Sequence, residues 1–348
     1  MRIAIDTTPL ETGHKDRGVG TYTKLLIEAL QKYEKKHSYS FFTRGQIVPE
    51  NADVVHYPYF DPFFLTLPVI KPRPTVVTVH DLTPLVFPEH FPVGFRGRLK
   101  WQIQRLSLGR ATRIITDSDS SKADITRIAG ISADTIDVVR LAPASEFSPV
   151  TDQALLRAVA TKYTLPRRFI LYVGDINGNK NILGLLKAFQ KQRDVKLVLA
   201  GIAFVEGSPE ANAIQSSIDV LGFRDEVIMP GFVPLEDLPA LYSLASVYVQ
   251  PSFYEGFGLP VLEAMASGCP VMSSRASSLA EIAGPAVLID PNNPEDFALR
   301  LREALMMPAD KRSALIQKGI LWAKRYSWEK VARQTVQSYE KAVSGEDN

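Results

Sequence analysis

Short apolar runs alternate with amphipathic stretches along almost the whole chain of 348 residues. In the first half, runs rich in β-branched residues predict strands at 2–6, 53–57, 75–80, 112–116 and 135–139. Apolar residues at helical spacing predict helices at 19–32, 95–109 and 120–129. Strands that are apolar almost throughout are typical of parallel sheets covered by helices on both faces, so an α/β fold is expected.

The second half repeats this alternation. Its predicted strands are RFILYVG, VKLVLAG, EVIMPG, SVYVQP, CPVMSS and AVLID. Helical patterns follow at 181–190, 211–221, 235–245, 259–267, 278–283, 294–307 and 311–325. Proline, serine and polar residues interrupt the pattern at 141–153, which predicts a linker. We therefore predict two doubly wound α/β domains, residues 1–150 and 151–326, with ligands beyond the carboxyl ends of the strands and a working site between the domains.

Length and composition agree with a two-domain globular protein. A chain of 348 residues is too long for one ordinary core. Its hydrophobic content is 45% and its charged content 22%. Cys269 is the only cysteine, which excludes an intrachain disulfide and a thiolate metal cluster. The start MRIAIDTTPL does not resemble a secretory signal, and no run approaches the roughly 18 apolar residues of a spanning helix. A cytoplasmic location is expected.

Positive charge is concentrated in one segment, although the net charge is only +2. Residues 91–116 contain no acid and six basic residues, Arg96, Arg98, Lys100, Arg105, Arg110 and Arg113. Apolar residues lie among them at Trp101, Ile103, Leu106 and Leu108. This pattern favours peripheral docking on anionic lipid, with the aromatic loop 57–64 as a second contact. An ordinary solvated helix remains the alternative. No nucleic-acid motif accompanies the charge, so we expect no nucleic-acid partner.

The segment PSFYEGFGLPVLEAMASGCPV, residues 251–271, contains the chemistry that stands out most. Gly256 and Gly258 lie between a predicted strand and a predicted helix that starts at Leu259. Exposed amides and the positive end of the helix dipole would bind an anion there, most simply a diphosphate. Glu263 would then accept hydrogen bonds from a ribose, and Glu255 would hold hydroxyls beyond the phosphates. The alternative is a tight connection with two solvated glutamates.

This segment resembles the signature of family-four retaining glycosyltransferases, a glutamate, seven residues and a second glutamate in the setting EGFGLPVLE. The resemblance implies the GT-B fold, in which two Rossmann-like domains face each other across a cleft. It implies an N-terminal acceptor domain, completed by a C-terminal helix at 327–344, and a C-terminal donor domain. It also implies a hexosyltransferase that uses a nucleotide-diphosphate sugar, retains the anomeric configuration and needs no metal.

The same resemblance assigns roles to individual residues. His80, which precedes Asp81, would hydrogen-bond the donor sugar, and Lys180 would neutralise the diphosphate. The family usually has an arginine about four residues before this lysine, and the chain has none in VGDINGNKNI. Glu255, His80 and Lys180 form the expected catalytic set. The expected donor-binding residues are Gly18, Gly20, Asn179, Gly231, Phe232, Val233, Gly256, Phe257, Gly258, Leu259 and Glu263.

Several alternatives remain open at this point. Asp117-Ser118-Asp119 could be the metal-binding Asp-x-Asp of single-domain glycosyltransferases, or a strand end followed by a helix cap. A dinucleotide oxidoreductase would need G-x-G-x-x-G after the first strand, and DTTPLETGHKDRGVGTY lacks it. A non-catalytic nucleotide-sugar or carbohydrate-binding protein is a third possibility.

The segment HDLTPLVFP favours GDP-mannose as donor, with UDP-glucose or UDP-N-acetylglucosamine as alternatives. The resemblance implies a lipid-linked or cell-surface glycan as acceptor, as in polysaccharide or lipopolysaccharide biosynthesis. It is compatible with docking on the inner face of the plasma membrane.

Overall fold

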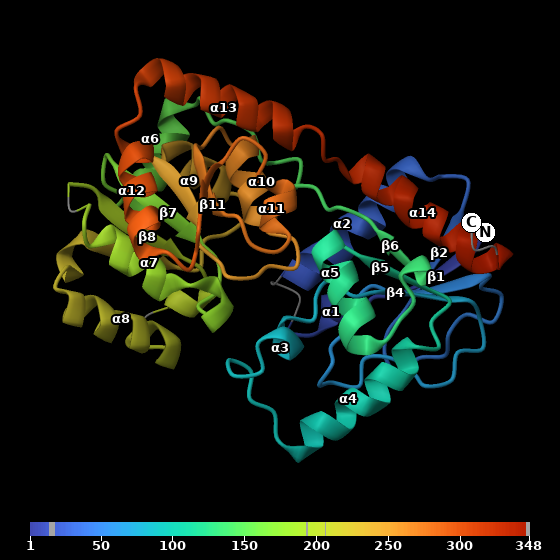
Figure 1. Cartoon of the computed structure of the whole chain (residues 1–348). Coiled ribbons are helices and arrows are strands. Elements are labelled where there is room, and N and C mark those ends of the chain that lie inside the picture. Colours follow the sequence, from blue (N-terminus) through green and yellow to red (C-terminus); the bar gives the residue numbers. More distant parts are fainter. Residues whose placement is uncertain (14–17, 193, 206, 346–348) are drawn as a thin grey trace. The chain divides into compact units, whose positions relative to one another are not determined.

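The computed structural model describes residues 1–13, 18–192, 194–205 and 207–345 (Figure 1). The chain divides into two compact units. Unit 1 consists of Met1–Leu141 and Ser327–Asn348, and unit 2 of Ala142–Tyr326. Each unit contains one six-stranded sheet in which all strand pairs are parallel.

The sheet of unit 1 has the order β2-β1-β3-β4-β5-β6. Its strands are β1 (Arg2–Asp6), β2 (Ser38–Phe42), β3 (Val54–Tyr57), β4 (Thr75–Thr78), β5 (Arg113–Thr116) and β6 (Ile136–Val138). The structure confirms every strand predicted in this half. It adds β2, which the sequence analysis missed because SYSFF is an edge strand with mostly half-exposed positions and no continuous apolar run.

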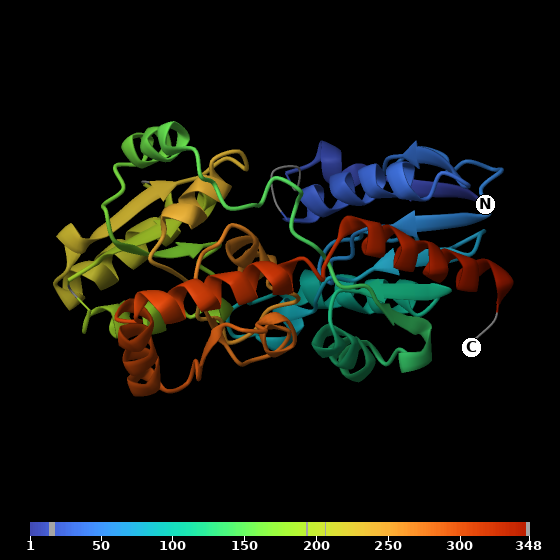
Figure 2. The same cartoon turned by 90° about the horizontal axis from the view of Figure 1, so that it is seen from above.

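Helices cover this sheet, and the last helix of the chain is one of them. They are α1 (Thr8–Glu11), α2 (Gly18–Tyr33), α3 (Thr83–Val86), α4 (Phe95–Leu108), α5 (Asp119–Asp124) and α14 (Trp328–Ser344). Ser327 caps α14 by accepting the amide of Lys330 at 3.3 Å. Val331, Thr335 and Tyr339 lie on the buried side of α14, which packs beside α2 and against β3, β4 and β5 (Figure 2). The last helix of the chain therefore belongs to unit 1.

The sheet of unit 2 has the order β12-β11-β10-β7-β8-β9. Its strands are β7 (Phe169–Val173), β8 (Lys196–Ala200), β9 (Val227–Gly231), β10 (Val247–Gln250), β11 (Val271–Ser274) and β12 (Val287–Ile289). All six coincide with predicted strands. The central strands β7, β8 and β10 are buried almost throughout, as expected for strands with helices on both faces.

The helices of unit 2 form two groups. One contains α7 (Ile182–Phe189), α8 (Pro209–Leu221) and α12 (Pro294–Leu305), and the other contains α6 (Gln153–Lys162), α9 (Leu238–Leu244), α10 (Leu259–Ala266) and α13 (Ala309–Ala323). A short helix, α11 (Leu279–Ile282), follows β11. The sequence analysis missed α6, a helix of which only Val159 is buried.

Loops that follow the strands of a parallel sheet meet at one edge. In unit 2, β10 and β7 are paired neighbours, so the signature after β10 and the loop after β7 lie side by side. In unit 1, β4 and β5 are paired neighbours, which brings residues 79–82 close to 117–118. The charged residues of the candidate site lie at these two edges.

Candidate active site

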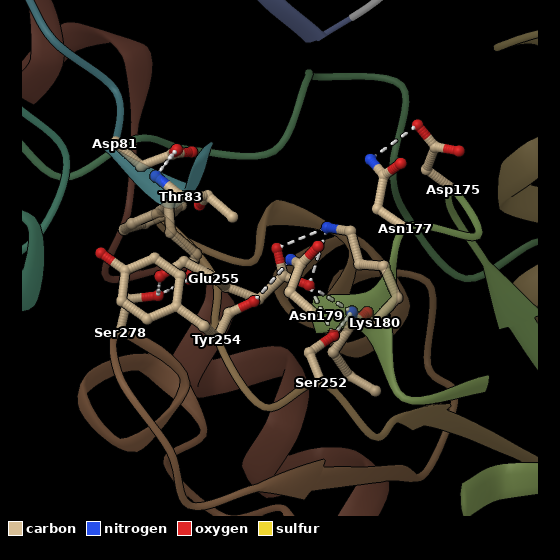
Figure 3. A network of polar contacts seen from close by, with 12 residues as sticks. Asp81, Thr83, Asp175, Asn177, Asn179, Lys180, Ser252, Tyr254, Glu255 and Ser278 are labelled. Carbon is tan, nitrogen blue, oxygen red and sulfur yellow. Dashed lines mark hydrogen bonds and ion pairs between the residues drawn. The ribbon is translucent and has the colours of Figure 1, made fainter. Parts of the chain in front are cut away.

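The Glu255 carboxylate is the centre of a hydrogen-bond network in unit 2 (Figure 3). The Lys180 ammonium lies 2.9 Å from Oε1 and 2.7 Å from Oε2. Oε1 also accepts hydrogen bonds from Ser252 Oγ at 2.6 Å and from Gln250 Nε2 at 2.8 Å. Glu255 is only 8% exposed, and a buried carboxylate of this kind needs a cation or several donors. Two of the three predicted catalytic residues thus form an ion pair.

Gly258 determines the shape of the loop that follows Glu255. It precedes the first residue of α10 with φ +95°, a conformation that side-chain-bearing residues rarely adopt. A Cβ atom there would lie 2.5 Å from Leu279 Cδ2. Ser278 Oγ donates to the carbonyl of Glu255 at 2.8 Å and to that of Phe257 at 3.0 Å. The Ser278 side chain therefore holds the backbone of this loop.

Three of the predicted donor-binding residues in this loop are buried, Gly256, Phe257 and Gly258. Gly256 is enclosed, and Phe257 is 5% exposed, with its ring 6.3 Å from that of Tyr326. The side chain of Phe257 therefore packs within unit 2, and only backbone atoms at these positions are suited to contact a ligand. Leu259, the first residue of α10, is half-buried.

Glu263 lies one turn into α10 and is half-buried. The Tyr242 hydroxyl donates to its Oε2 at 3.2 Å. Burial raises the pKa of Glu263 to about 7, and the hydrogen bond from Tyr242 only partly opposes this. The second glutamate of the signature is therefore divided between its neutral and ionised forms near neutral pH.

The loop after β7 is fastened to the signature by asparagine side chains. Asn179 Nδ2 donates to the carbonyl of Tyr254 at 3.0 Å, and Asn181 Nδ2 donates to the carbonyl of Pro251 at 3.1 Å. Asn179 is 3% exposed, and its Oδ1 has no hydrogen-bond partner among the described residues. Lys180 stands between these two anchors, which explains how its ammonium reaches Glu255.

The residues expected near the nucleobase lie at the end of β9, further along the same sheet edge. Gly231 has φ +72°, Phe232 is 50% exposed and Val233 is 6% exposed. Only the side chain of Phe232 is therefore open to a ligand in this structure. No contact joins these residues to Glu255 or Lys180 among the interactions described for the residues of unit 2.

In unit 1, His80 is paired with a residue that the sequence analysis did not assign to it. His80 Nδ1 lies 2.7 Å from Asp117 Oδ2, and Asp117 is 2% exposed. The adjacent Asp81 instead accepts the amide of Thr83 at 2.8 Å, at the start of α3. His80 and Asp117 follow the paired strands β4 and β5, and this pairing, which the sequence pattern does not show, brings the two side chains together.

Burial and charge act in opposite directions on this pair. Burial lowers the pKa of His80, but the Asp117 carboxylate outweighs burial, so the pKa of His80 is raised overall. Burial raises the pKa of Asp117, and His80 opposes this shift. The pair therefore holds a proton firmly, with Asp117 on one imidazole nitrogen.

The Asp-x-Asp alternative does not fit the structure. Asp117 pairs with His80, whereas Asp119 lies 2.5 Å from Arg140. Ser118 caps α5 by accepting the amide of Ser121 at 3.0 Å. The segment is a strand end followed by a helix cap. In the described part of the chain, no three His, Cys, Asp or Glu side chains gather as a metal site would require.

Two further groups of predicted residues lie in unit 1. Gly18 and Gly20 belong to the first turn of α2, and residues 14–17 before them lie outside the described residues. In the basic segment, Trp101 packs against the core and Leu108 is fully buried, while Arg105 Nε donates to the carbonyl of Ala129 at 3.1 Å. These three side chains are engaged within unit 1.

Comparison with known proteins follows the same division of the chain. The family described as "Glycosyl transferases group 1" matches residues 160–322, and "Glycosyltransferase Family 4" matches residues 33–141. The "O-antigen chain mannosyltransferase B" of Escherichia coli is 36% identical over 274 residues, which cover 76% of this chain and 69% of that protein. The chain belongs to the group 1 glycosyltransferases.

Other relatives of this group 1 glycosyltransferase carry related names. The "MMP alpha-(1->4)-mannosyltransferase" of Mycolicibacterium hassiacum is 30% identical over 70% of this chain and 57% of that protein. The "Serotype-specific mannosyltransferase WbdA" of Escherichia coli is 28% identical over 85% of this chain, which spans only 37% of WbdA. The predicted family and the prediction of a glycosyltransferase are thereby confirmed.

Solved structures establish the fold. Sucrose-phosphate synthase from Thermosynechococcus elongatus superposes with a TM-score of 0.75 at 20% identity, over 99% of this chain and 100% of that one. WaaG, "a glycosyltransferase involved in lipopolysaccharide biosynthesis", gives a TM-score of 0.72 at 13% identity, over 97% and 99% of the two chains. Together with the two parallel sheets, these likenesses confirm the predicted GT-B fold class.

Proposed function

We propose that this glycosyltransferase moves mannose from GDP-mannose to a hydroxyl of a lipid-linked or cell-surface glycan, with retention of the anomeric configuration. The observation that carries the proposal is the Lys180–Glu255 pair at the start of the signature, because it places a cation and a hydroxyl-binding carboxylate beside the end of α10 that favours anions. Relatives named as mannosyltransferases, among them an O-antigen enzyme, support the sugar and the kind of acceptor.

The proposed reaction breaks the bond between the anomeric carbon and the diphosphate oxygen. The acceptor hydroxyl forms the new bond on the same face, and its proton passes to the leaving phosphate. Lys180 and the amides near Gly258 stabilise the negative charge that develops on the diphosphate. Glu255 holds the sugar hydroxyls and Glu263 the ribose. The scheme uses no protein nucleophile and no metal ion.

Residues of unit 1 contribute the remaining proposed contacts. His80 donates from Nε2 to an oxygen of the donor sugar while Asp117 occupies Nδ1. Backbone atoms at Gly18 and Gly20, in the first turn of α2, face the phosphates and the acceptor. In unit 2, Gly231, Phe232 and Val233 contact the nucleobase, with Phe232 as the open side chain.

A donor screen tests the proposal. Melting temperature is measured with GDP-mannose, UDP-glucose and UDP-N-acetylglucosamine, since a ligand at 100 times its Kd adds about 2.7 kcal/mol to stability. We expect the largest increase with GDP-mannose, followed by transfer to a lipid-linked glycan acceptor, an α-linked product by NMR and full activity in EDTA. Stabilisation by UDP-sugars alone would overturn the choice of mannose, and a β-linked product would overturn retention.

We further propose that unit 1 docks on anionic membrane surfaces through α4. In the described residues, no helix is both long enough and apolar enough to cross a bilayer. Phe95 is 81% exposed and Leu99 54% exposed on this helix, among Arg96, Arg98 and Lys100. Exposed apolar and cationic side chains on one helix are suited to the boundary between headgroups and acyl chains. Lys100 Nζ lies 5.2 Å from the ring centre of Phe64, which joins the aromatic loop to the same surface.

Liposome flotation tests the docking proposal. The protein is expected to float with vesicles that contain phosphatidylglycerol. The double variant Phe95→Ser, Leu99→Ser is expected to bind these vesicles at least fivefold more weakly, because each CH2 group that no longer inserts into the lipid costs ~0.8 kcal/mol of binding free energy. The control is Val220→Ser, at an 87% exposed position on α8 of unit 2. Binding that does not depend on phosphatidylglycerol content would contradict the proposal.

A further inference from the structure

Behind Glu255 runs a chain of buried hydrogen bonds that the proposed reaction does not use. The Tyr248 hydroxyl donates to Gln250 Oε1. Gln250 Nε2 donates to Ser252 Oγ at 2.9 Å and to Glu255 Oε1 at 2.8 Å, and Ser252 Oγ donates to the same Oε1 at 2.6 Å. We call Tyr248, Gln250 and Ser252 the relay. Oε1 therefore has two neutral donors in addition to Lys180.

The direction of these hydrogen bonds is determined by burial. Tyr248 and Ser252 are 0% exposed and Gln250 is 2% exposed. Burial raises the pKa of Tyr248 well above its ordinary value, so its hydroxyl stays protonated and acts as a donor. The amide oxygen of Gln250 must face this donor, which leaves the amide nitrogen to face Glu255. The groups of the relay that face the Glu255 carboxylate are therefore hydrogen-bond donors.

Burying a glutamine side chain at this position costs free energy unless its amide group forms hydrogen bonds. Gln250 ends β10, a central strand whose other residues, Val247, Tyr248 and Val249, are at most 1% exposed. An apolar residue would pack there without the need for partners. The amide nitrogen of Gln250 donates to Ser252 and to Glu255. We infer that this polar side chain is present to stabilise the Glu255 carboxylate.

Donor binding would disturb the ion pair that the relay supports. Lys180 contacts both oxygens of Glu255, yet the proposed reaction requires the same ammonium at the diphosphate. A buried carboxylate that loses its cation is strongly destabilised unless other donors remain. After Lys180 turns to the phosphates, the relay donors to Oε1 are the side-chain donors that remain among the described contacts of this carboxylate.

We propose that Tyr248, Gln250 and Ser252 are positioning residues that hold the Glu255 carboxylate and stabilise its charge while Lys180 binds the diphosphate. This inference rests on the proposed function, because it assumes that Lys180 moves to a diphosphate. It follows that the relay sets diphosphate affinity indirectly. Without it, Glu255 retains Lys180 more strongly, and the nucleotide competes less well for the ammonium.

Nucleotide binding in a double-variant cycle tests this dependence. Calorimetry measures the Kd of GDP and of UDP for wild type, Gln250→Leu and Ser252→Ala, each also combined with Glu255→Gln. We expect each relay variant to raise the Kd about tenfold, the scale of one hydrogen bond to a charged group. In combination with Glu255→Gln the effect should fall below about twofold, because a neutral amide does not compete for Lys180.

Two further variants distinguish a specific effect on nucleotide binding from a general loss of structure. Tyr248→Phe removes only the hydroxyl that orients Gln250 and should raise the Kd about threefold, again only when Glu255 is present. Ser273→Ala is the matched control, since Ser273 is 0% exposed on β11 and its hydroxyl donates to the Ser274 carbonyl. It should leave the Kd unchanged.

The outcomes separate the inference from the proposed function. A loss of affinity that is equally large with Glu255→Gln would show a merely structural role and overturn the inference. Relay variants that bind like wild type would overturn it as well. If neither GDP nor UDP binds the wild-type protein, the proposed function itself fails before any variant is compared.

Discussion

Each unit has a carboxylate paired with a cationic side chain at the carboxyl ends of neighbouring parallel strands, but the two pairs differ in their remaining hydrogen bonds. In unit 2, both oxygens of Glu255 are occupied by Lys180, and Oε1 has two further donors. In unit 1, Asp117 Oδ1 has no hydrogen-bond partner among the described residues, and His80 Nε2 is buried, with a backbone contact to Pro58 that raises the pKa of the imidazole. Both pairs are largely buried, so water does not readily replace the missing partners.

This difference indicates that the two pairs would respond differently when a ligand binds. The pair in unit 2 is complete by itself and must exchange partners when an anion binds. The pair in unit 1 is already oriented, with one imidazole nitrogen held by Asp117 and the other buried. Substitutions at Lys180 should therefore remove charge stabilisation, whereas substitutions at Asp117 should change the orientation and protonation of His80.

The largest effect is expected for Lys180→Ala. Loss of the cation removes stabilisation of the departing diphosphate, so kcat should fall by ~10²–10³. Initial rates with saturating donor measure this. Lys187→Ala, at an exposed position on α7, is the matched control and should keep wild-type kcat. Normal turnover by a folded Lys180→Ala enzyme would exclude the lysine from this role and remove the functional meaning of its pair with Glu255.

Asp117→Asn should have the next largest effect, with kcat/KM lower by about tenfold near pH 8. Without the carboxylate, burial is opposed only by the smaller effects of Asp81 and the Pro58 backbone, so the pKa of His80 falls. Activity that needs protonated His80 is lost as the pH rises through this pKa, so the loss should begin at lower pH in the variant. The other titratable groups near His80 are Asp81, Tyr22 and His56, and burial lowers the pKa of His56 to about 3.

Asp81→Asn is the control for this experiment, because Asp81 contacts the amide of Thr83 and makes no hydrogen bond to His80. It should retain activity within about threefold and shift the pH profile less than Asp117→Asn does, because the Asp81 charge raises the pKa of His80 less than Asp117 does. If both variants shift the profile equally, the Asp117–His80 contact is not what sets the protonation of His80, and the contrast between the two units fails.

The sequence was informative where the chemistry lies in one continuous segment. Glu255, Gly258 and Glu263 fall within nine residues, so the spacing alone indicated a strand, a glycine turn and a helix with two carboxylates. The strand-to-helix turn is confirmed, and Gly258 has the positive φ that such a turn requires. The roles of the two glutamates stay predictions.

Contacts between distant segments were not predictable in this way. Asp117 is 37 residues from His80, and Lys180 is 75 residues from Glu255. Each pair forms only because two particular strands are neighbours in a sheet, and strand order is not visible in hydrophobic periodicity. The relay residue Gln250 was likewise taken as part of an apolar strand, since a single polar residue in such a run gives no signal of its partner.

The smallest effect is expected at the second glutamate of the signature. Burial raises the pKa of Glu263 to about 7, so folding favours its protonated form. Its ionised form is less stable in the folded than in the unfolded state, and stability is therefore lost as the pH rises from its ordinary pKa to about 7. Glu263→Gln should remove this loss and raise the melting temperature at pH 8 by about 2–6 °C, while at pH 4 the difference should vanish. The same variant should weaken GDP binding about fivefold at pH 8, because an ionised acceptor of the ribose hydroxyls is lost.

Tyr242→Phe, which removes the donor to Oε2, should lower stability at pH 8 and so serves as the opposite control. A melting temperature for Glu263→Gln that falls below that of wild type at pH 8 would mean that the ionised carboxylate stabilises unit 2, and that this glutamate resembles the fully partnered Glu255 after all.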